Sequence, residues 1–342
     1  MKKKLNNVLV IGGMGFIGSC IIKNLIKKKL VNKCIILDNF SSQIDPLNIG
    51  FQDFRKNRFE AFLDLNEFVK SKSKFINIER GNAENYSVVH KVIKEYSPDV
   101  IIHLAALPIA KINNITCEEF RKGSVDSTTN IIEAINYCKK DGLLKNLKRF
   151  VYISSSMVYG DFQKNVAAET HPTNPKEPYG TMKLAGEVIT RGLCGYFHIP
   201  YTIIRPSAVY GPTDMNQRVS QYFIIKAMKN EIIEIHGKDE KLDFTYVEDL
   251  ADGIIKSILS EKGKNEIFNI TQGKGQKIIN YVKILKKYYK NLKFFIKKRD
   301  SFRPKRGTLS ISKARKLIGY KPKTKLSQGI KKYVDFYLNL KK

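Results

Sequence analysis

Short apolar runs, many of them β-branched, alternate with longer amphipathic stretches through the first 205 residues of the chain. Apolar runs of about four to eight residues are typical of buried parallel strands, and apolar residues spaced three or four apart are typical of helices. The pattern predicts strands at Val8–Gly12, Cys34–Asp38, Phe75–Glu79, Val100–Leu104, Phe150–Ser154 and Tyr201–Arg205. It predicts helices near Ile17–Lys28, Ser87–Tyr96, Glu118–Cys138 and Tyr179–Phe197.

This alternation of strand and helix predicts an α/β fold with a doubly wound parallel sheet. The stretch Ser41–Lys74 is long for a connection and contains several phenylalanines, so it is expected to carry a helix of its own. After about residue 206 the elements become shorter and mixed, with glycines between them. We therefore expect a first domain over residues 1–205 and a smaller mixed α/β lobe over residues 206–342, with some exchange of chain between them.

Cysteines, histidines and the N-terminal residues exclude several classes of protein. The five cysteines are scattered and form no C-x-x-C pair, so neither a disulfide framework nor a zinc site is indicated, and the five histidines show no metal-ligand spacing. The lysines after Met1 resemble the start of a signal peptide, but the apolar run from Val8 to Ile11 is too short for one or for a membrane span. We expect a cytoplasmic protein without a metal and without membrane insertion.

The chain has 61 lysines and arginines against 32 aspartates and glutamates, which gives a formal net charge of +29. Such a charge fits either a polyanionic partner or a lysine-coated, solvated surface. Lysines greatly outnumber arginines, are spread from end to end, and form no block with interleaved aromatic residues. The second interpretation is favoured, so no nucleic-acid partner is expected, although the positive field would attract an anionic substrate.

A glycine-rich segment, Gly12-Gly13-Met14-Gly15-Phe16-Ile17-Gly18, lies between the first predicted strand and the first predicted helix. Its glycines allow a tight turn, a close approach to a pyrophosphate and close packing of helix on strand, while the helix N-terminus favours negative charge. Asp38 ends the second predicted strand about 20 residues later, where a carboxylate accepts the ribose hydroxyls and repels a 2′-phosphate. The segment therefore predicts a dinucleotide site for NAD rather than NADP.

Further motifs follow in order along nearly the whole chain. They are Gly12–Gly18, Asp38-Asn39, His103-Leu104-Ala105-Ala106, Ser154–Gly160, Tyr179–Lys183, Arg205–Pro212, Asp243–Asp249 and Ser312–Tyr320. In these motifs the chain resembles the extended short-chain dehydrogenase/reductase superfamily, in particular its nucleotide-sugar epimerases and dehydratases, with the UDP-glucose 4-epimerases among them. The resemblance implies a Rossmann-type N-terminal domain that holds NAD and a C-terminal lobe that holds a nucleotide-diphosphate sugar.

The resemblance also implies which residues contact the cofactor. They come from the glycine-rich turn, from the ends of the following strands, and from the helix that begins near Tyr179. Asn82 and Ala83 are expected at the adenine, where the family often has Asp at the first position. The full set is Gly12, Gly15, Phe16, Ile17, Gly18, Asp38, Asn39, Asn82, Ala83, Leu104, Ala105, Ala106, Tyr179 and Lys183.

Tyr179 and Lys183 are four residues apart, so they share a face of the predicted helix. A tyrosine ordinarily has a pKa of about 10. A lysine ammonium one turn away, together with the positive nicotinamide ring, stabilises the phenolate, which then takes a proton from a sugar hydroxyl while the carbon beneath gives hydride to NAD⁺. Alignment with the family on Val158-Tyr159-Gly160 places Ser155 at the catalytic Ser/Thr position, with its two serine neighbours as alternatives.

The two residues after Ser155 narrow the expected reaction. The 4,6-dehydratases of the family have an Asp-Glu pair there, which supplies an acid and a base, whereas this chain has Ser156-Met157, expected at the substrate. Dehydration is therefore disfavoured, and decarboxylation, which often keeps the Glu, is weakened. Epimerisation at C4 needs only the Tyr, the Lys, the Ser and NAD, and it is the simplest interpretation. A nucleotide-sugar dehydrogenase that stops at the keto sugar uses the same residues and stays open as an alternative.

By the same resemblance, arginines bind the diphosphate of the substrate. Arg218 and Arg303 match two such arginines. The chain departs from the family at Leu242, where an Arg is usual, and at Ala208, where many members have Asn. These departures leave room for a GDP- or CDP-sugar, or for a different grip by Lys305-Arg306, so the sequence predicts neither the base nor the sugar.

Members of the family commonly dimerise through two helices, which correspond here to Glu118–Cys138 and Tyr179–Phe197, so a homodimer is expected. A function of another class, NAD sensing or RNA binding without catalysis, is compatible with the fold and the charge. The complete set of Ser155, Tyr179 and Lys183 argues against it, because a sensor has no need of them.

Overall fold

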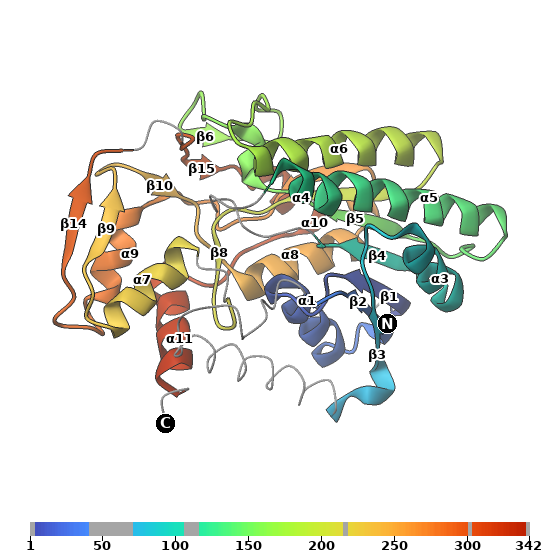
Figure 1. Ribbon diagram of the computed structural model, residues 1–342, viewed down its shortest axis with the longest axis horizontal. Coiled ribbons are helices and arrows are strands. Elements are labelled where there is room, and N and C mark those ends of the chain that lie inside the picture. Colours follow the sequence, from blue (N-terminus) through green and yellow to red (C-terminus); the bar gives the residue numbers. More distant parts are fainter. Residues whose placement is uncertain (1–3, 41–70, 106–115, 215–217, 300–302, 340–342) are drawn as a thin grey trace.

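The computed structural model of the chain describes residues 4–40, 71–105, 116–214, 218–299 and 303–339. Within these residues the centre is a sheet of seven parallel strands in the order β12-β7-β5-β4-β1-β2-β3 (Figure 1). The strands are β1 (Leu5–Ile11), β2 (Val31–Asp38), β3 (Ile76–Arg80), β4 (Val100–His103), β5 (Arg149–Ile153), β7 (Tyr201–Arg205) and β12 (Glu266–Asn269). The strand order reverses between β1 and β4, and doubly wound sheets bind ligands at such a point, beyond the carboxyl ends of the strands.

Helices cover both faces of this sheet (Figure 1). One face carries α1 (Phe16–Lys27), α8 (Val247–Leu259) and α10 (Ser312–Ile318), and the other carries α3 (Tyr86–Tyr96), α5 (Ser127–Lys140) and α6 (Pro178–Tyr196). Successive side chains of a strand point to opposite faces, so Val10 packs into the first layer and Ile11 into the second. Because both faces are covered, the central strands carry continuous apolar runs, such as Val8–Ile11 in β1, and the predicted fold class is confirmed.

All six strands predicted from the apolar runs are present, with ends that differ by a few residues. The stretch predicted as one helix near Glu118–Cys138 consists instead of α4 (Cys117–Arg121), a π-helical turn over Lys122–Asp126, and α5. The strand β12 was not predicted, because its four residues are only half apolar. The helix expected within Ser41–Lys74 falls mainly on residues outside the described ranges.

The second half of the chain builds a smaller core of its own, in which Tyr210, Tyr281 and Tyr333 are completely buried. Its elements are β8 (Val209–Tyr210), α7 (Val219–Met228), β9 (Ile233–His236), β10 (Lys241–Leu242), β11 (Thr245–Tyr246), β13 (Gln276–Lys277), α9 (Ile278–Leu285), β14 (Phe294–Lys297) and α11 (Leu326–Asn339). β15 (Thr308–Leu309) pairs with β6 (Val166–Ala167) of the first half. The remaining short turns are η1 (Ser73–Phe75), η3 (Ser156–Tyr159) and η4 (Glu261–Gly263).

Two elements of the second half belong to the layers of the large sheet. β12 pairs with β7, and α8 packs on α1. The division into an NAD domain (1–205) and a substrate lobe (206–342) thus stays a prediction. Within it, β12 and α8 belong to the second half by sequence but pack with the first.

Candidate active site

The turn that follows β1 requires glycine at its first position. Gly12 has a φ of 81°, which L side chains rarely adopt, and a Cβ there would lie 2.9 Å from the backbone nitrogen of Ala105. The N–H of Gly12 donates to the carbonyl of Leu37 (2.8 Å), which joins the turn to the end of β2. The turn leads into α1 at Gly15 without a side-chain cap, so no side-chain acceptor occupies the positive end of this helix.

Gly18 allows α1 to pack directly against this turn. A Cβ on Gly18 would lie 2.5 Å from the carbonyl oxygen of Gly12 and 2.7 Å from the Cα of Gly13. Phe16 and Ile17, which open the helix, are half-buried against the core beneath α1. The close approach of helix and strand end is the geometry that brings a backbone near to a bound pyrophosphate.

Asp38 lies at the end of β2, beside the glycine-rich turn, with only 6% of its surface exposed. Its Oδ2 accepts a hydrogen bond from the N–H of Met14, and its Oδ1 accepts one from the N–H of Phe40, both at 2.8 Å. Burial raises the pKa of this carboxyl above its usual value, and the two hydrogen bonds oppose the shift. The structure therefore places a buried carboxylate beside the glycine-rich turn, at the position where the sequence predicts a contact with a ribose.

The other predicted cofactor residues lie along the same edge of the sheet. Nδ2 of Asn39 donates to Oδ1 of Asn82, and Ala83 beside it is buried. The N–H groups of Leu104 and Ala105 both donate to the carbonyl of Ile11, at 2.9 and 3.1 Å, so the end of β4 touches the glycine-rich turn. Ala106, the last residue of this set, lies outside the described ranges.

Lys183 is buried on α6, with 4% of its surface exposed. Its Nζ donates to the carbonyl of Ile153 (2.9 Å) and lies 6.0 Å from the centre of the Tyr179 ring. Burial lowers the pKa of Lys183 to about 7, and the carboxylate of Glu187, one turn further along, acts in the opposite direction. Burial thus works against the charged form of Lys183, and Glu187 works in its favour.

Tyr179 is half-buried at the start of α6. Burial raises the pKa of its phenol, while the positive charge of Arg218 and a hydrogen bond with Ser155 lower it. Ser155 follows β5, and its Oγ accepts a hydrogen bond from the N–H of Met157 (3.1 Å) at the start of η3. The structure therefore brings the three predicted catalytic side chains together at the carboxyl end of the sheet.

The contacts of the three consecutive serines differ. The hydroxyl of Ser154 donates to Glu187 (2.5 Å), behind the site, and the N–H of Ser156 donates to the carbonyl of Pro206 (2.8 Å). Of the three hydroxyls, that of Ser155 is the one that acts on Tyr179, where it lowers the pKa of the phenol. This geometry favours Ser155 over its neighbours as the third catalytic residue.

Two buried charged residues behind this site were not predicted from the sequence. Arg205, at the end of β7, donates through Nε and Nη2 to the carboxylate of Glu187, at 2.8 and 2.6 Å. A signal was present, because Glu187 is four residues after Lys183 and so lies on the same side of α6. The sequence could not show, however, that an arginine from a distant strand would meet it.

The residues predicted at the substrate lie around the same edge. Ser156 and Met157 are buried, and neither side chain carries an acidic or basic group. Arg218 stands at the start of α7, and its charge acts on Tyr179. Arg303 is half-buried. The pKa of Arg306 is lowered to about 10, mainly by burial and also by the positive charge of Arg303, while the charges of Glu177 and Glu240 oppose this shift.

The two departures from the family pattern are accounted for locally. Leu242, which replaces the usual Arg, is 6% exposed and packs in the core of the second half. Ala208, which replaces Asn, has a φ of 38° and is half-buried at the same core. Neither can bind a diphosphate through its side chain.

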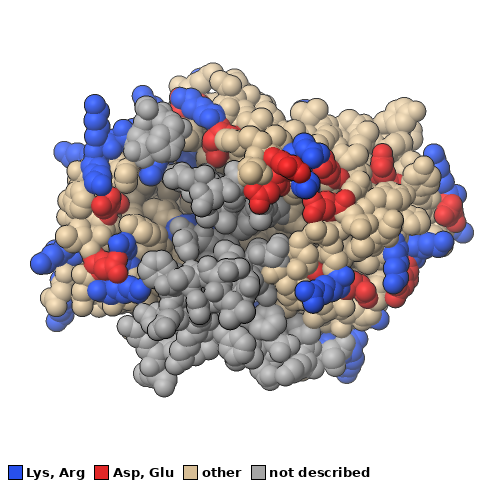
Figure 2. All heavy atoms as spheres, viewed as in Figure 1, with Lys and Arg blue, Asp and Glu red and all other residues tan. Residues whose placement is uncertain are grey.

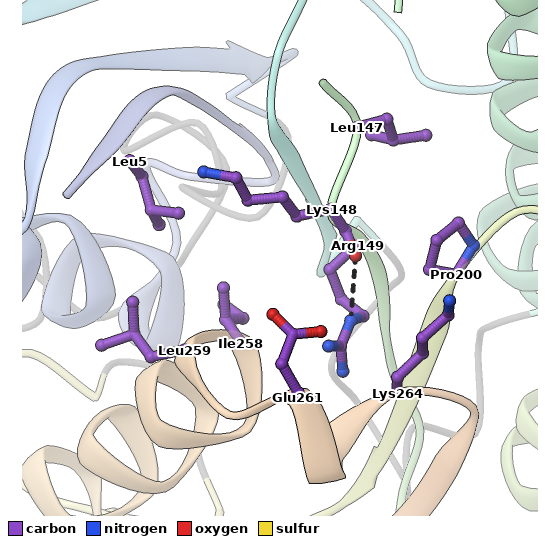
Figure 3. A pocket seen from close by; sticks show the side chains of 9 residues that line it. All are labelled: Leu5, Leu147, Lys148, Arg149, Pro200, Ile258, Leu259, Glu261 and Lys264. Atoms are coloured by element: carbon purple, nitrogen blue, oxygen red, sulfur yellow. Dashed lines mark hydrogen bonds between the residues drawn. The ribbon is translucent and has the colours of Figure 1, made fainter. Parts of the chain in front are cut away.

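A pocket lies where β1 and β5 begin and α8 ends, and Figure 3 shows the side chains that line it. It is lined by Leu5, Leu147, Lys148, Arg149, Pro200, Ile258, Leu259, Glu261 and Lys264. Buried Arg149 donates there to Thr202 Oγ1 (2.8 Å) and to the carbonyls of Ser257 and Ser260 (both 3.3 Å) near the end of α8. Because a cation at a helix C-terminus is stabilising, this arginine has a structural role. None of the predicted site residues lines the pocket.

Lysine and arginine side chains are scattered over the face shown in Figure 2 and are interspersed with acidic ones, rather than gathered in one patch. Many are paired, as in Lys297 with Glu234 (2.7 Å) and Lys313 with Glu266 (2.6 Å). Over the described ranges, no helix is both long and apolar enough to cross a membrane.

Three comparisons relate the chain to known proteins. The NAD dependent epimerase/dehydratase family matches residues 8–271. A putative UDP-glucose 4-epimerase of Methanocaldococcus jannaschii is 30% identical over 341 residues, which cover 97% of this chain and 98% of that protein. The crystal structure of a UDP-glucuronic acid 4-epimerase from Bacillus cereus, in complex with UDP-glucuronic acid and NAD, matches with a TM-score of 0.83 at 26% identity, and covers 98% of this chain and 99% of that one.

A larger relative is a trifunctional UDP-glucose 4,6-dehydratase/UDP-4-keto-6-deoxy-D-glucose 3,5-epimerase/UDP-4-keto-L-rhamnose-reductase of Arabidopsis thaliana. It is 25% identical over 341 residues, which cover 97% of this chain but 47% of that protein. The chain therefore spans about half the length of the plant relatives it matches.

Proposed function

Because the chain belongs to the NAD dependent epimerase/dehydratase family, with NAD as its cofactor, we propose that it is a nucleotide-sugar 4-epimerase. The predicted family, the Rossmann-type fold and the cofactor are confirmed by the relatives. The observation that carries the choice of reaction is the pair that follows Ser155. Buried Ser156 and Met157 offer neither the acid nor the base that loss of water from the sugar requires.

The described residues fit the cofactor. A turn that only glycine can form, a helix start without a side-chain cap, and the buried carboxylate of Asp38 lie together at the switch point of the sheet. The glycine turn and the helix start suit a pyrophosphate, and the carboxylate of Asp38 suits a ribose. When bound, NAD⁺ would supply the acceptor for a hydride from C4 of the sugar and, once reduced, the donor that returns it to the other face.

The proton chemistry belongs to Tyr179, Lys183 and Ser155. As a phenolate, Tyr179 accepts the proton of the C4 hydroxyl, and Ser155 bridges that hydroxyl and the phenol through hydrogen bonds. The nearby Lys183 ammonium stabilises the phenolate. After the keto sugar has rotated within the site, so that its other face meets the hydride donor, Tyr179 gives the proton back to the C4 oxygen.

The proposed substrate is a UDP-hexose or a UDP-hexuronic acid. Its support is that the Methanocaldococcus and Bacillus relatives are named for UDP-sugars. Arg218, Arg303 and Arg306 are proposed to bind the diphosphate and to compensate for Leu242 and Ala208. Guanidinium groups at this edge suit a dianionic diphosphate.

Incubation of the protein and NAD⁺ with UDP-, GDP-, CDP- and dTDP-sugars, followed by NMR and mass spectrometry, tests the proposal. Epimerisation gives a new sugar of unchanged mass, and Tyr179→Phe should slow it at least about a hundredfold. A product that has lost water identifies a dehydratase, and one that has lost two hydrogens identifies a dehydrogenase. Either product contradicts the proposed reaction.

The assembly is proposed to be a homodimer through α5 and α6. Its support is a set of exposed apolar side chains on these helices, with Tyr137 54%, Val188 53% and Tyr196 78% exposed. Exposed apolar side chains on both helices are compatible with burial between subunits. We also propose that the enzyme is cytoplasmic and supplies a sugar for polysaccharide synthesis. Its five cysteines are all free thiols, which is compatible with a reducing compartment.

A further inference from the structure

Glu187 and Arg205 form a buried ion pair directly behind the catalytic residues. Glu187 is 0% exposed and Arg205 is 4% exposed. The guanidinium also lies 4.8 Å from the centre of the Tyr159 ring and donates through Nη1 to the carbonyl of Glu169 (3.3 Å), so it is fixed from several sides. A buried ion pair loses the hydration of both charges and rarely adds much net stability, so its position beside a reactive lysine is the informative feature.

The carboxylate of Glu187 also fixes the strand end that carries Ser155. Its Oε1 accepts a 2.5 Å hydrogen bond from the hydroxyl of Ser154. The carbonyl of the preceding residue, Ile153, accepts a 2.9 Å hydrogen bond from Nζ of Lys183. The last residues of β5 are thus held to α6 by two side chains that are one helical turn apart.

The position of Glu187 on α6 gives its charge unequal effects on the two catalytic groups. It is one turn from Lys183 and two turns from Tyr179. Its charge opposes the lowering of the Lys183 pKa by burial, whereas the charges that act on Tyr179 are those of Arg218 and Glu177. A negative charge nearer to the amine favours the state in which nitrogen keeps the proton and the phenol has lost it.

The titratable groups on the strands beside Lys183 are neutral. Burial lowers the pKa of His103 on β4 to about 3, and burial raises the pKa of Tyr152 on β5 far above its usual value. On the adjoining helical segments, the exposed charges of Arg121 and Asp126 pair with each other. Within the described residues, the charge that acts on Lys183 is that of Glu187, whose carboxylate is paired with Arg205.

We propose that Glu187 is a positioning residue for the epimerase: it holds the end of β5 through Ser154, and it keeps Lys183 protonated, so that the ammonium stabilises Tyr179 as a phenolate. Arg205 balances this charge and orients the carboxylate. The inference rests on the proposed function, but its main test requires no turnover.

The test follows the near-ultraviolet absorbance of tyrosinate in the NAD-bound protein as the pH is raised. Subtracting the same titration of the matching Tyr179→Phe protein isolates Tyr179. In Glu187→Gln the uncompensated Arg205 disfavours the Lys183 ammonium, so the midpoint for Tyr179 should rise by about one pH unit. In Arg205→Gln the midpoint should fall, by less, because an unpaired buried carboxylate takes up a proton more readily. The double variant should return towards the wild type.

Arg149→Gln is the matched control, because Arg149 is as buried as Arg205 but lies where β5 begins, among the residues that line the pocket in Figure 3. It should lower the melting temperature and leave the Tyr179 titration unchanged. Shifts of the same sign in both single variants, or no shift beside a lowered melting temperature, overturn the proposal and leave the pair a structural one. If Glu187→Gln does not fold, Arg205→Gln and the double variant still give the sign.

Turnover separates this inference from the proposed function. If sugars are epimerised, Glu187→Gln should lower kcat at neutral pH about tenfold with little change in KM, because its effect is on the proton and not on the diphosphate. Opposite titration shifts without turnover of any nucleotide sugar contradict the epimerase and support the role of Glu187. Turnover without opposite shifts contradicts the role of Glu187 alone.

Discussion

The backbone N–H of Met14 donates a 2.8 Å hydrogen bond to Oδ2 of Asp38, so the glycine-rich turn and the end of β2 form one unit. The second carboxylate oxygen is held by the N–H of Phe40. Each oxygen keeps further lone pairs that can accept ribose hydroxyls. The acceptor is therefore oriented before the cofactor arrives, which lowers the entropy lost on binding.

Asp38→Asn should weaken the binding of NAD at least about tenfold, because asparagine keeps the shape but loses the charge and one acceptor. The preference for NAD over NADP should shrink as well, since the repulsion of the 2′-phosphate disappears. Calorimetric titration with both cofactors measures the two effects. Asp335→Asn, at an exposed residue of α11, is the control. Unchanged affinity for NAD in Asp38→Asn would show that this carboxylate does not bind the cofactor.

Gly18→Ala should destabilise the protein and weaken NAD binding, because the new Cβ would lie 2.5 Å from the carbonyl oxygen of Gly12. Overpacking of this kind costs about 1–3 kcal/mol. Gly192→Ala on α6 is the matched change, since a Cβ there meets nothing within 4 Å, and it should stabilise the helix by up to about 1 kcal/mol. Urea unfolding of both proteins checks this contrast, and equal effects would contradict it.

Lys183→Met should stabilise the cofactor-free protein most at low pH while removing activity. Burial lowers the pKa of Lys183 from 10.5 to about 7, so between these values the unfolded chain binds more protons at this site than the folded chain does. Stability of the wild type therefore gains from this group as the pH rises, by at most about 1.4 kcal/mol per pH unit. The advantage of the methionine variant should accordingly shrink from about pH 7 to pH 10. A difference in unfolding free energy that does not vary with pH would exclude this account.

Val188→Glu should convert the proposed dimer into a monomer, because it places a charge at an exposed apolar residue of α6 within the proposed interface. Sedimentation at micromolar concentration measures the change. Leu338→Glu on α11, at a residue that is 43% exposed, should leave the mass unaltered. If the wild type itself sediments as a monomer, the proposed interface is wrong.

The fold was predictable because parallel strands covered on both faces need continuous apolar runs, as at Val8–Ile11. The π-helical turn over Lys122–Asp126 was not, since one inserted residue in a helix leaves no apolar signature. β12 was missed because its pairing with β7 joins segments more than 60 residues apart. Such pairing depends on the rest of the fold more than on the four residues themselves.

The site was predictable where local chemistry demands particular residues. The glycine at position 12, which adopts a φ of 81°, and the spacing of Tyr179 and Lys183 are both visible in the sequence. The meeting of Glu187 with Arg205 was not, because it depends on how α6 lies across the sheet. The choice of Ser155 among three serines likewise needed contacts, since adjacent residues after a strand differ only in direction.

The place of β12 has a consequence for biosynthesis. Until residue 269 has left the ribosome, the outer edge of β7 has no partner and presents a row of unpaired backbone groups. The large sheet is therefore completed only after part of the second core has been synthesised, and the two halves must mature together. A chimaera made by one cut at residue 205 would inherit a sheet without its last strand, so exchange of substrate lobes between relatives has to leave β12 and α8 with the sheet on which they lie.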